Sequence, residues 1–112
     1  MAESHEPSCF DLVAGLAAQF DPGAARGQEG EIQFFFSGGE SGACYLRLTK
    51  SGCTFHRGEA LYPKLTLRVK AEVWKAIMRG DLSWEKAMME RHFLATGNFP
   101  PLAQMPRIFR FG

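Results

Sequence analysis

Few side chains in this sequence have the types and spacing that covalent or metal chemistry requires. Cys53 and His56 are potential metal ligands, but three residues apart on a predicted strand they point to opposite faces, and no second pair follows nearby. Glu85 and Glu90 flank an apolar helical stripe, which is more typical of a solvated face than of an acid and base pair. No histidine stands beside a recognisable nucleophile. We therefore expect no metal, no cofactor and no enzyme activity.

The glycine-rich segment at residues 38–42 (GGESG) is predicted to be a turn and not a phosphate-binding loop. It lacks the Lys-Ser/Thr ending of such loops, and it lies between two predicted strands instead of before a helix. The 112 residues carry 13 Lys and Arg against 12 Asp and Glu, which gives no general attraction to nucleic acid or to an anionic membrane. We predict no nucleic-acid partner and at most transient membrane contact.

The more informative side chains are long, flexible and apolar. Methionine and aromatic side chains adapt to varied apolar shapes, whereas rigid cores favour Leu, Ile and Val with sharper rotamers. Such side chains lie close together in sequence at Trp74, Met78, Trp84, Met88, Met89 and Phe93. They indicate either the lining of a site for hydrophobic ligands or an ordinary filled core.

These side chains belong to residues 64–98, which are predicted to form a strand, two helices and a second strand. Branched apolar and polar side chains alternate over residues 65–69, as on a strand with one buried face. Apolar side chains then change to helical spacing until Gly80, a typical helix C-terminal residue. Ser83 is the predicted N-cap of the second helix, and residues 92–96 form the closing strand.

The order and spacing of these elements resemble the sterol carrier protein (non-specific lipid-transfer) domain. The matching segments are TLRV in the first strand, AIMRGDL across the turn between the helices, SWEKAMM in the second helix and FLATGN at the closing strand and turn. This chain departs from the family at Arg91, where Gly is common, and at Pro100, Pro101 and Pro106, which interrupt the usual closing helix. Arg91 is interpreted either as a surface cation or as a partner for a ligand carboxylate or phosphate.

Outside residues 64–98, the sequence predicts a flexible tail, a first helix, a loop and three strands. Residues 1–7 form the tail, and Ser8 caps a helix whose apolar stripe runs to about Gln19. Residues 23–30, with three glycines, are predicted to be a loop. The strands follow at residues 31–36, 44–49 and 53–57.

Residues 8–112 are predicted to form a single α+β domain. Hairpin-like links between successive strands, including residues 58–63, predict a mostly antiparallel five-stranded sheet with helices packed on one face, as in sterol carrier proteins. A short helix that covers the sheet's open side is predicted from the spacing of Leu102, Met105, Ile108 and Phe109.

The resemblance implies a soluble carrier that binds and releases its ligand without covalent chemistry. It implies an apolar tunnel between sheet and helices that holds a fatty acyl, sterol-like or prenyl/quinone-type lipid. The predicted lining consists of Phe34, Phe36, Leu46, Trp74, Ile77, Met78, Trp84, Met88 and Phe93. The alternative hypothesis is a protein-interaction or dimerisation module, acting as a homodimer or as an accessory to a partner enzyme for hydrophobic intermediates.

The sequence also predicts a cytoplasmic location. Its first residues, MAESHEPSCF, have no basic region followed by an apolar run, and no stretch approaches the roughly 20 apolar residues of a membrane span. The three cysteines follow no pattern of a small secreted domain, which favours reduced thiols.

Overall fold

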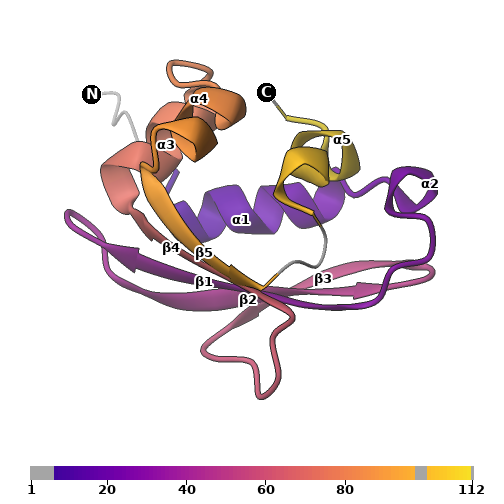
Figure 1. The fold of residues 1–112 in the computed structure, drawn as a ribbon. Coiled ribbons are helices and arrows are strands. Elements are labelled where there is room, and N and C mark those ends of the chain that lie inside the picture. The colour runs from indigo at the N-terminus through magenta and orange to yellow at the C-terminus, as the bar shows by residue number, and fades with distance from the viewer. Residues whose placement is uncertain (1–6, 98–100, 112) are drawn as a thin grey trace, which may run out of the picture.

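The computed structural model describes residues 7–97 and 101–111 as one layer of helices on one sheet, with every helix on the same face (Figure 1). The helices are α1 (Cys9–Ala18), α2 (Pro22–Ala25), α3 (Ala71–Arg79), α4 (Trp84–Met89), the 3₁₀ turn η1 (Leu102–Gln104) and α5 (Met105–Phe109). The strands are β1 (Gly30–Ser37), β2 (Gly42–Thr49), β3 (Gly52–Arg57), β4 (Leu65–Lys70) and β5 (Phe93–Gly97). Most of the predicted tail, together with Asn98 and Pro100, lies outside the described residues.

The alternating pattern of the strands divides the sheet into two different faces. Ile32, Phe34 and Phe36 of β1 are buried toward the helices, while Phe35 between them is half-buried on the opposite face. Strands β2 and β4 alternate in the same way. The core therefore lies between the sheet and the helix layer, and we call the other side of the sheet the helix-free face.

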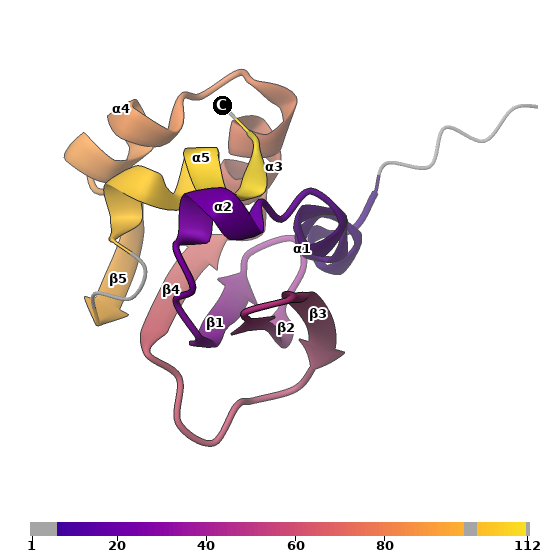
Figure 2. The ribbon, with the colours of Figure 1, turned by 90° about the vertical axis from the view of Figure 1, so that its right-hand side faces the viewer.

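The strand order is β3-β2-β1-β4-β5, and among the described strands only the pairing of β1 with β4 is parallel. This confirms the predicted five-stranded, mostly antiparallel sheet. The prediction of a hairpin-like link over residues 58–63 is wrong, because this loop carries the chain from the edge strand β3 past β2 and β1 to β4. Figures 1 and 2 show the loop beneath the sheet, on the helix-free face.

Gln33 fixes this crossover loop from the middle of β1. Its side chain is 1% exposed. The Gln33 amide nitrogen donates to the carbonyl oxygens of Cys44 at 3.0 Å and Gly58 at 3.1 Å, and its oxygen accepts from the Ala60 backbone N–H at 2.7 Å. A buried amide that is satisfied by the backbone of two distant segments specifies one path for the loop. These bonds join residues that are far apart in the sequence, and no local sequence pattern encodes them. The sequence analysis therefore predicts a hairpin-like link instead of a crossover.

Helix ends follow the local signals in the sequence. Ser8 and Asp11 form a capping box at the start of α1, which ends at Ala18, one residue before the predicted end. The Ser83 hydroxyl accepts from the Lys86 N–H at 3.1 Å at the start of α4. Gly80 closes α3 with a φ of 85°, a left-handed conformation that glycine adopts readily.

The predicted loop at residues 23–30 begins as a helix instead. The Asp21 carboxylate accepts from the Gly23 and Ala24 N–H groups at 3.0 and 3.2 Å, and Pro22 occupies the first helical position of α2. The same Asp-Pro-Gly sequence that ends α1 therefore also begins a new turn of helix. This turn packs against α5 at the C-terminal end of the chain (Figure 2).

The C-terminal segment forms the predicted short helix but does not cover the sheet's open side. Met105, Ile108 and Phe109 are buried in the core on the same face as the other helices. The apolar stripe of α5 completes the helix layer and does not extend to the helix-free face. Among the described residues, no helix has the length and apolar character needed to cross a membrane.

Candidate ligand-binding site

The predicted lining residues all lie in or against the core between the sheet and the helices. Those that are buried are Phe34, Phe36, Leu46, Trp74, Ile77, Trp84 and Phe93, while Met78 and Met88 are half-buried against them. Met89, which the sequence grouped with these side chains, is 80% exposed and points away from the core. The aromatic members form two groups, one around Trp74 and one around Trp84.

The first aromatic group joins α3 to the centre of the sheet. Trp74 contacts Phe34 edge to face, with ring centroids 5.4 Å apart, and lies 6.0 Å from Phe36. Phe10 of α1 contacts Phe36 at 6.1 Å and closes the group from the other side. Phe10 was recognised only as part of a helical stripe, because nothing in the sequence brings α1, which packs on β2 and β3, to Phe36 of β1.

The indole nitrogen of Trp74 is the unusual atom in this group. The Trp74 side chain is 1% exposed, and its Nε1 has no hydrogen-bond partner among residues 7–97 and 101–111. A buried donor without an acceptor costs about 1–3 kcal/mol, so native proteins rarely leave one unsatisfied. This N–H therefore marks a place in the core where an oxygen atom would be stabilised.

The second aromatic group holds α4 to β5 and to the C-terminal segment. Trp84 stacks on Phe93 with centroids 4.8 Å apart and meets Phe111 edge to face at 5.4 Å. Its indole N–H donates to the Leu102 carbonyl oxygen at 2.7 Å. We call this bond the Trp84–Leu102 latch. Phe111 lies beyond the predicted closing helix. It therefore belongs to no helical pattern of apolar residues from which its contact with Trp84 could have been predicted.

Two surface grooves flank the latch. A groove of about 240 Å³ is lined by Met88, Arg91, Phe93, Leu94, Ala95 and Leu102. A second groove, of about 520 Å³, is lined by Ser83, Trp84, Glu85, Ala103, Pro106, Arg107 and Phe111. Both grooves are lined by residues of α4 and of the segment at residues 102–111. Met78 lies elsewhere, in a groove of about 100 Å³ that it shares with Leu12 of α1.

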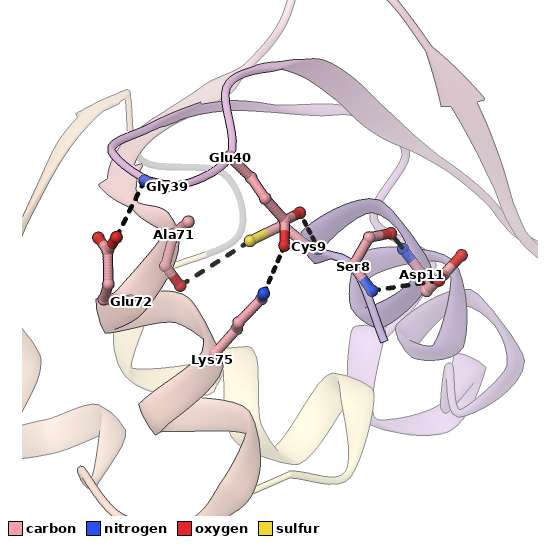
Figure 3. A network of polar contacts seen from close by, with 8 residues as sticks. All are labelled: Ser8, Cys9, Asp11, Gly39, Glu40, Ala71, Glu72 and Lys75. Carbon is pink, nitrogen blue, oxygen red and sulfur yellow. Dashed lines mark hydrogen bonds and ion pairs between the residues drawn. The ribbon is translucent and has the colours of Figure 1, made fainter. Parts of the chain in front are cut away.

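A polar network connects the turn between β1 and β2 with α1 and α3 (Figure 3). Glu40, in the turn between β1 and β2, accepts from the Cys9 backbone N–H at 2.8 Å and forms an ion pair with Lys75 of α3. Glu72 accepts from the Gly39 N–H at 2.9 Å in the same turn. The turn is thus tied to both α1 and α3, and we expect this end of the domain to move less than the end at the latch.

The network gives the stability of the domain a defined pH dependence. The Lys75 ammonium and the Cys9 backbone N–H hold the pKa of Glu40 below its usual value of 4.5. Since the pKa is lowered in the folded state, the stabilisation is complete well above pH 4.5 and is lost as the pH falls through the folded-state pKa.

We therefore expect Glu40→Gln to flatten the decline in melting temperature below about pH 5. Scanning calorimetry between pH 3 and 7 measures this slope. Glu85→Gln, which removes an exposed carboxylate from α4, is the matched control and should leave the slope unchanged. Identical pH profiles for wild type and Glu40→Gln would contradict the assigned role.

The cysteines do not provide a nucleophile. Burial raises the pKa of Cys9 to about 11 and those of Cys44 and Cys53 to about 12. All three thiols are therefore protonated at neutral pH, and a protonated, buried thiol reacts slowly.

Cys53 and His56 lie on different faces of β3, as their spacing predicted. Cys53 packs against the core, whereas the His56 ring stacks on Tyr45 with centroids 4.9 Å apart. Among the described residues, no three His, Cys, Asp or Glu side chains come together as metal ligands.

Comparison with known proteins defines the fold of the chain. No protein-family model and no curated protein sequence matches it. Among solved structures, palmitated SCP2L2 from Aedes aegypti superposes with a TM-score of 0.74 at 18% identity, over 91% of this chain and 94% of that chain. The UbiJ-SCP2 ubiquinone synthesis protein gives 0.64 at 11% identity, over 88% and 87%.

A third structure comes from a much larger protein. A double mutant of the sec-alkyl sulfatase PisA1 superposes with a TM-score of 0.71 at 17% identity, over 83% of this chain. The match spans only 15% of the sulfatase chain. The described residues therefore have the sterol carrier protein fold, which confirms the predicted resemblance at the level of the fold.

Proposed function

We propose that this domain binds a hydrophobic ligand between its sheet and its helices and releases it without covalent chemistry. The observation that carries the proposal is the unpartnered Trp74 N–H, which lies in an otherwise apolar aromatic group. A ligand oxygen at this position would remove the cost of the unsatisfied donor. The remaining ligand surface would be stabilised by apolar burial, at about 25 cal/mol for each Å².

The single donor narrows the class of ligand. An acyl chain, a sterol-like alcohol and a prenylated quinone each combine a large apolar body with at least one acceptor oxygen. A pure hydrocarbon would leave the Trp74 N–H unsatisfied. We therefore propose an oxygen-bearing lipid, with its oxygen at Trp74 and its apolar part among Phe34, Phe36 and Ile77.

Entry is proposed at the Trp84–Leu102 latch. The grooves on both sides of the latch are the places where solvent approaches the second aromatic group. Opening would break one hydrogen bond and two aromatic contacts, whereas opening the other end would break the Glu40 network. Lipid would then displace side chains that fill the core in the ligand-free domain.

Similar structures support the proposal by analogy. The Aedes aegypti protein was solved with palmitate, an acyl chain, and UbiJ-SCP2 is described as a ubiquinone synthesis protein. These properties belong to those proteins, and at their low identity only the fold is shared.

Native mass spectrometry of the purified protein, followed by organic extraction, tests the proposal. We expect a monomer with one bound lipid, or a monomer that takes up added palmitic acid in a one-to-one complex. A protein that carries nothing and takes up neither palmitic acid nor a prenylated quinone would overturn the proposal.

A protein-interaction role is the second candidate, because large apolar side chains are exposed. Leu61 and Tyr62 of the crossover loop are 87% and 85% exposed. Exposed aromatic and aliphatic residues are common at sites of association. An empty dimer in the same mass spectra, with dissociation caused by Tyr62→Ser, would favour this role.

A further inference from the structure

The helix-free face carries a cross-strand row of side chains that the proposed interior site does not use. Phe35 of β1 pairs with Arg68 of β4, and Arg68 pairs with Leu94 of β5. The Arg68 guanidinium carbon lies 4.4 Å from the centre of the Phe35 ring, a cation–π contact. Leu94 at the end of the row is 64% exposed. The row therefore places one cation between an aromatic and an aliphatic side chain.

More cations gather where the row meets the ends of the strands. Lys70 ends β4, and Arg91 and His92 immediately precede β5. Together with the row they line a groove of about 510 Å³, which we call the cationic groove and whose lining includes Phe35, Arg68, Lys70, Arg91, His92 and Leu94. This groove shares Arg91, Phe93 and Leu94 with the smaller of the two latch grooves.

The charge in the cationic groove is not balanced by acidic residues in its lining. No Asp or Glu lines it. Two lining residues have acidic partners, because His92 bonds to Glu90 at 2.9 Å and the Lys70 ammonium helps to lower the pKa of Glu72. Within residues 7–97 and 101–111, neither Arg68 nor Arg91 forms an ion pair with a carboxylate. Two guanidinium groups are thus available to an anion.

The backbone at Arg91 adds an independent observation. Arg91 has a φ of 57°, in the left-handed region that glycine adopts without strain. A long cationic side chain is therefore present at a position where the backbone suits glycine better. That side chain lies at the rim of the cationic groove, where its charge adds to those of Arg68 and Lys70.

We propose that the cationic groove binds the anionic head of an amphiphile. A phosphate or carboxylate would be held by Arg68, Lys70 and Arg91, since guanidinium groups bind such anions through paired hydrogen bonds. The apolar part of the ligand would lie on Phe35 and Leu94. Phe35, Arg68 and Leu94 lie on the helix-free face, away from Trp74, although Phe36, Val69 and Phe93 of the core also line the groove. The proposal does not rest on the proposed interior site.

The test uses hexyl phosphate, a monomeric probe with one phosphate and a short apolar chain. Two-dimensional NMR of the full chain should show amide shifts at residues 35–37, 68–70 and 91–94, with affinity that falls as salt is added. Arg91→Gly should weaken binding roughly tenfold, because it removes one charge-assisted contact. Absence of binding, or shifts confined to α1, α3 and α4, would overturn the proposal.

Arg26→Gly provides a matched control. Arg26 has a φ of 54°, so the same substitution relieves the same backbone conformation and removes the same charge outside the groove. We expect Arg26→Gly to have the same affinity for hexyl phosphate as the wild type. If Arg26→Gly and Arg91→Gly weakened binding equally, the loss would result from net charge alone, and this would contradict binding in the cationic groove. Arg68→Gln should also weaken binding of hexyl phosphate. If neither Arg91→Gly nor Arg68→Gln lowered the affinity, the proposed site would be overturned.

Further binding experiments distinguish a lipid headgroup in a bilayer from a free amphiphile as the source of the anion. Binding to phosphatidylglycerol vesicles but not phosphatidylcholine vesicles, with loss in Arg91→Gly, would support a bilayer headgroup. Binding of monomeric hexyl phosphate without vesicle binding would support a free amphiphile. Inorganic phosphate that binds as tightly as hexyl phosphate would contradict the role of Phe35 and Leu94. Uptake of palmitic acid into the interior should be unchanged in Arg68→Gln, because Arg68 lines neither latch groove. Failure at one site is therefore distinguishable from failure at the other.

Discussion

Replacing Gly97 with alanine is expected to destabilise the domain by about 3 kcal/mol or more. Gly97 ends β5 with a φ of 100°, a conformation that costs other residues about 1–3 kcal/mol. A β-carbon at this position would also overlap the carbonyl oxygen of Lys64, which belongs to the neighbouring chain segment. Neither problem can be relieved by rotating a side chain, because the obstacle is backbone. This explains in physical terms the glycine of the FLATGN segment.

Urea denaturation followed by circular dichroism measures the change at Gly97. Gly15→Ala in α1 is the control, because a β-carbon there meets no atom within 4 Å. That substitution should stabilise the helix by up to about 1 kcal/mol. A Gly97→Ala protein as stable as wild type would show that β5 and the adjoining backbone of Lys64 are placed differently from this structure.

Replacing Trp74 with phenylalanine is expected to separate ligand affinity from folding. The substitution removes the unpartnered N–H, and this alone would stabilise the folded domain by about 1–3 kcal/mol. It also leaves a cavity, which destabilises the folded domain. We therefore expect a change of less than about 2 kcal/mol in the free energy of unfolding. The affinity for palmitic acid should fall about tenfold, since one hydrogen bond to the ligand is lost.

Isothermal titration calorimetry with palmitic acid measures this affinity. Phe36→Leu is a useful comparison, because it alters the same aromatic group without removing a donor. It should weaken binding of palmitic acid and of hexadecane by similar factors, whereas Trp74→Phe should weaken binding of palmitic acid more than that of hexadecane. Equal affinity of wild type and Trp74→Phe for palmitic acid would place the ligand oxygen elsewhere.

The sequence predicted the elements and faces that depend on local chemistry. Ser8, Gly80 and Ser83 end or begin helices through bonds to residues within four positions, so their types alone locate the boundaries. The alternation around Phe34 and Phe36 likewise identified the buried face of β1 before the helices were placed. The predicted lining residues consequently lie in or against the core.

Features that depend on distant partners were not predictable. The parallel pairing of β1 with β4 follows a crossover loop, which Gln33 holds through bonds to residues 25 and 27 positions away. Without that pairing, the contact of Arg68 with Phe35 cannot be inferred, and the cationic groove stays hidden. The unpaired state of the Trp74 N–H is also a property of the packed core, since every tryptophan carries the same donor.

The fluorescence emission of Trp74 tests most directly whether a ligand oxygen binds to the Trp74 N–H between the sheet and the helices. The chain has two tryptophans, so Trp84→Phe leaves Trp74 as the only indole reporter. In the ligand-free variant, we expect blue-shifted emission from a buried indole without a hydrogen bond. Palmitic acid should shift this emission to the red as its oxygen accepts from the N–H, while hexadecane should bind without that shift. Emission that does not respond to any concentration of palmitic acid, although mass spectrometry shows the complex, would contradict a ligand site between the sheet and α3.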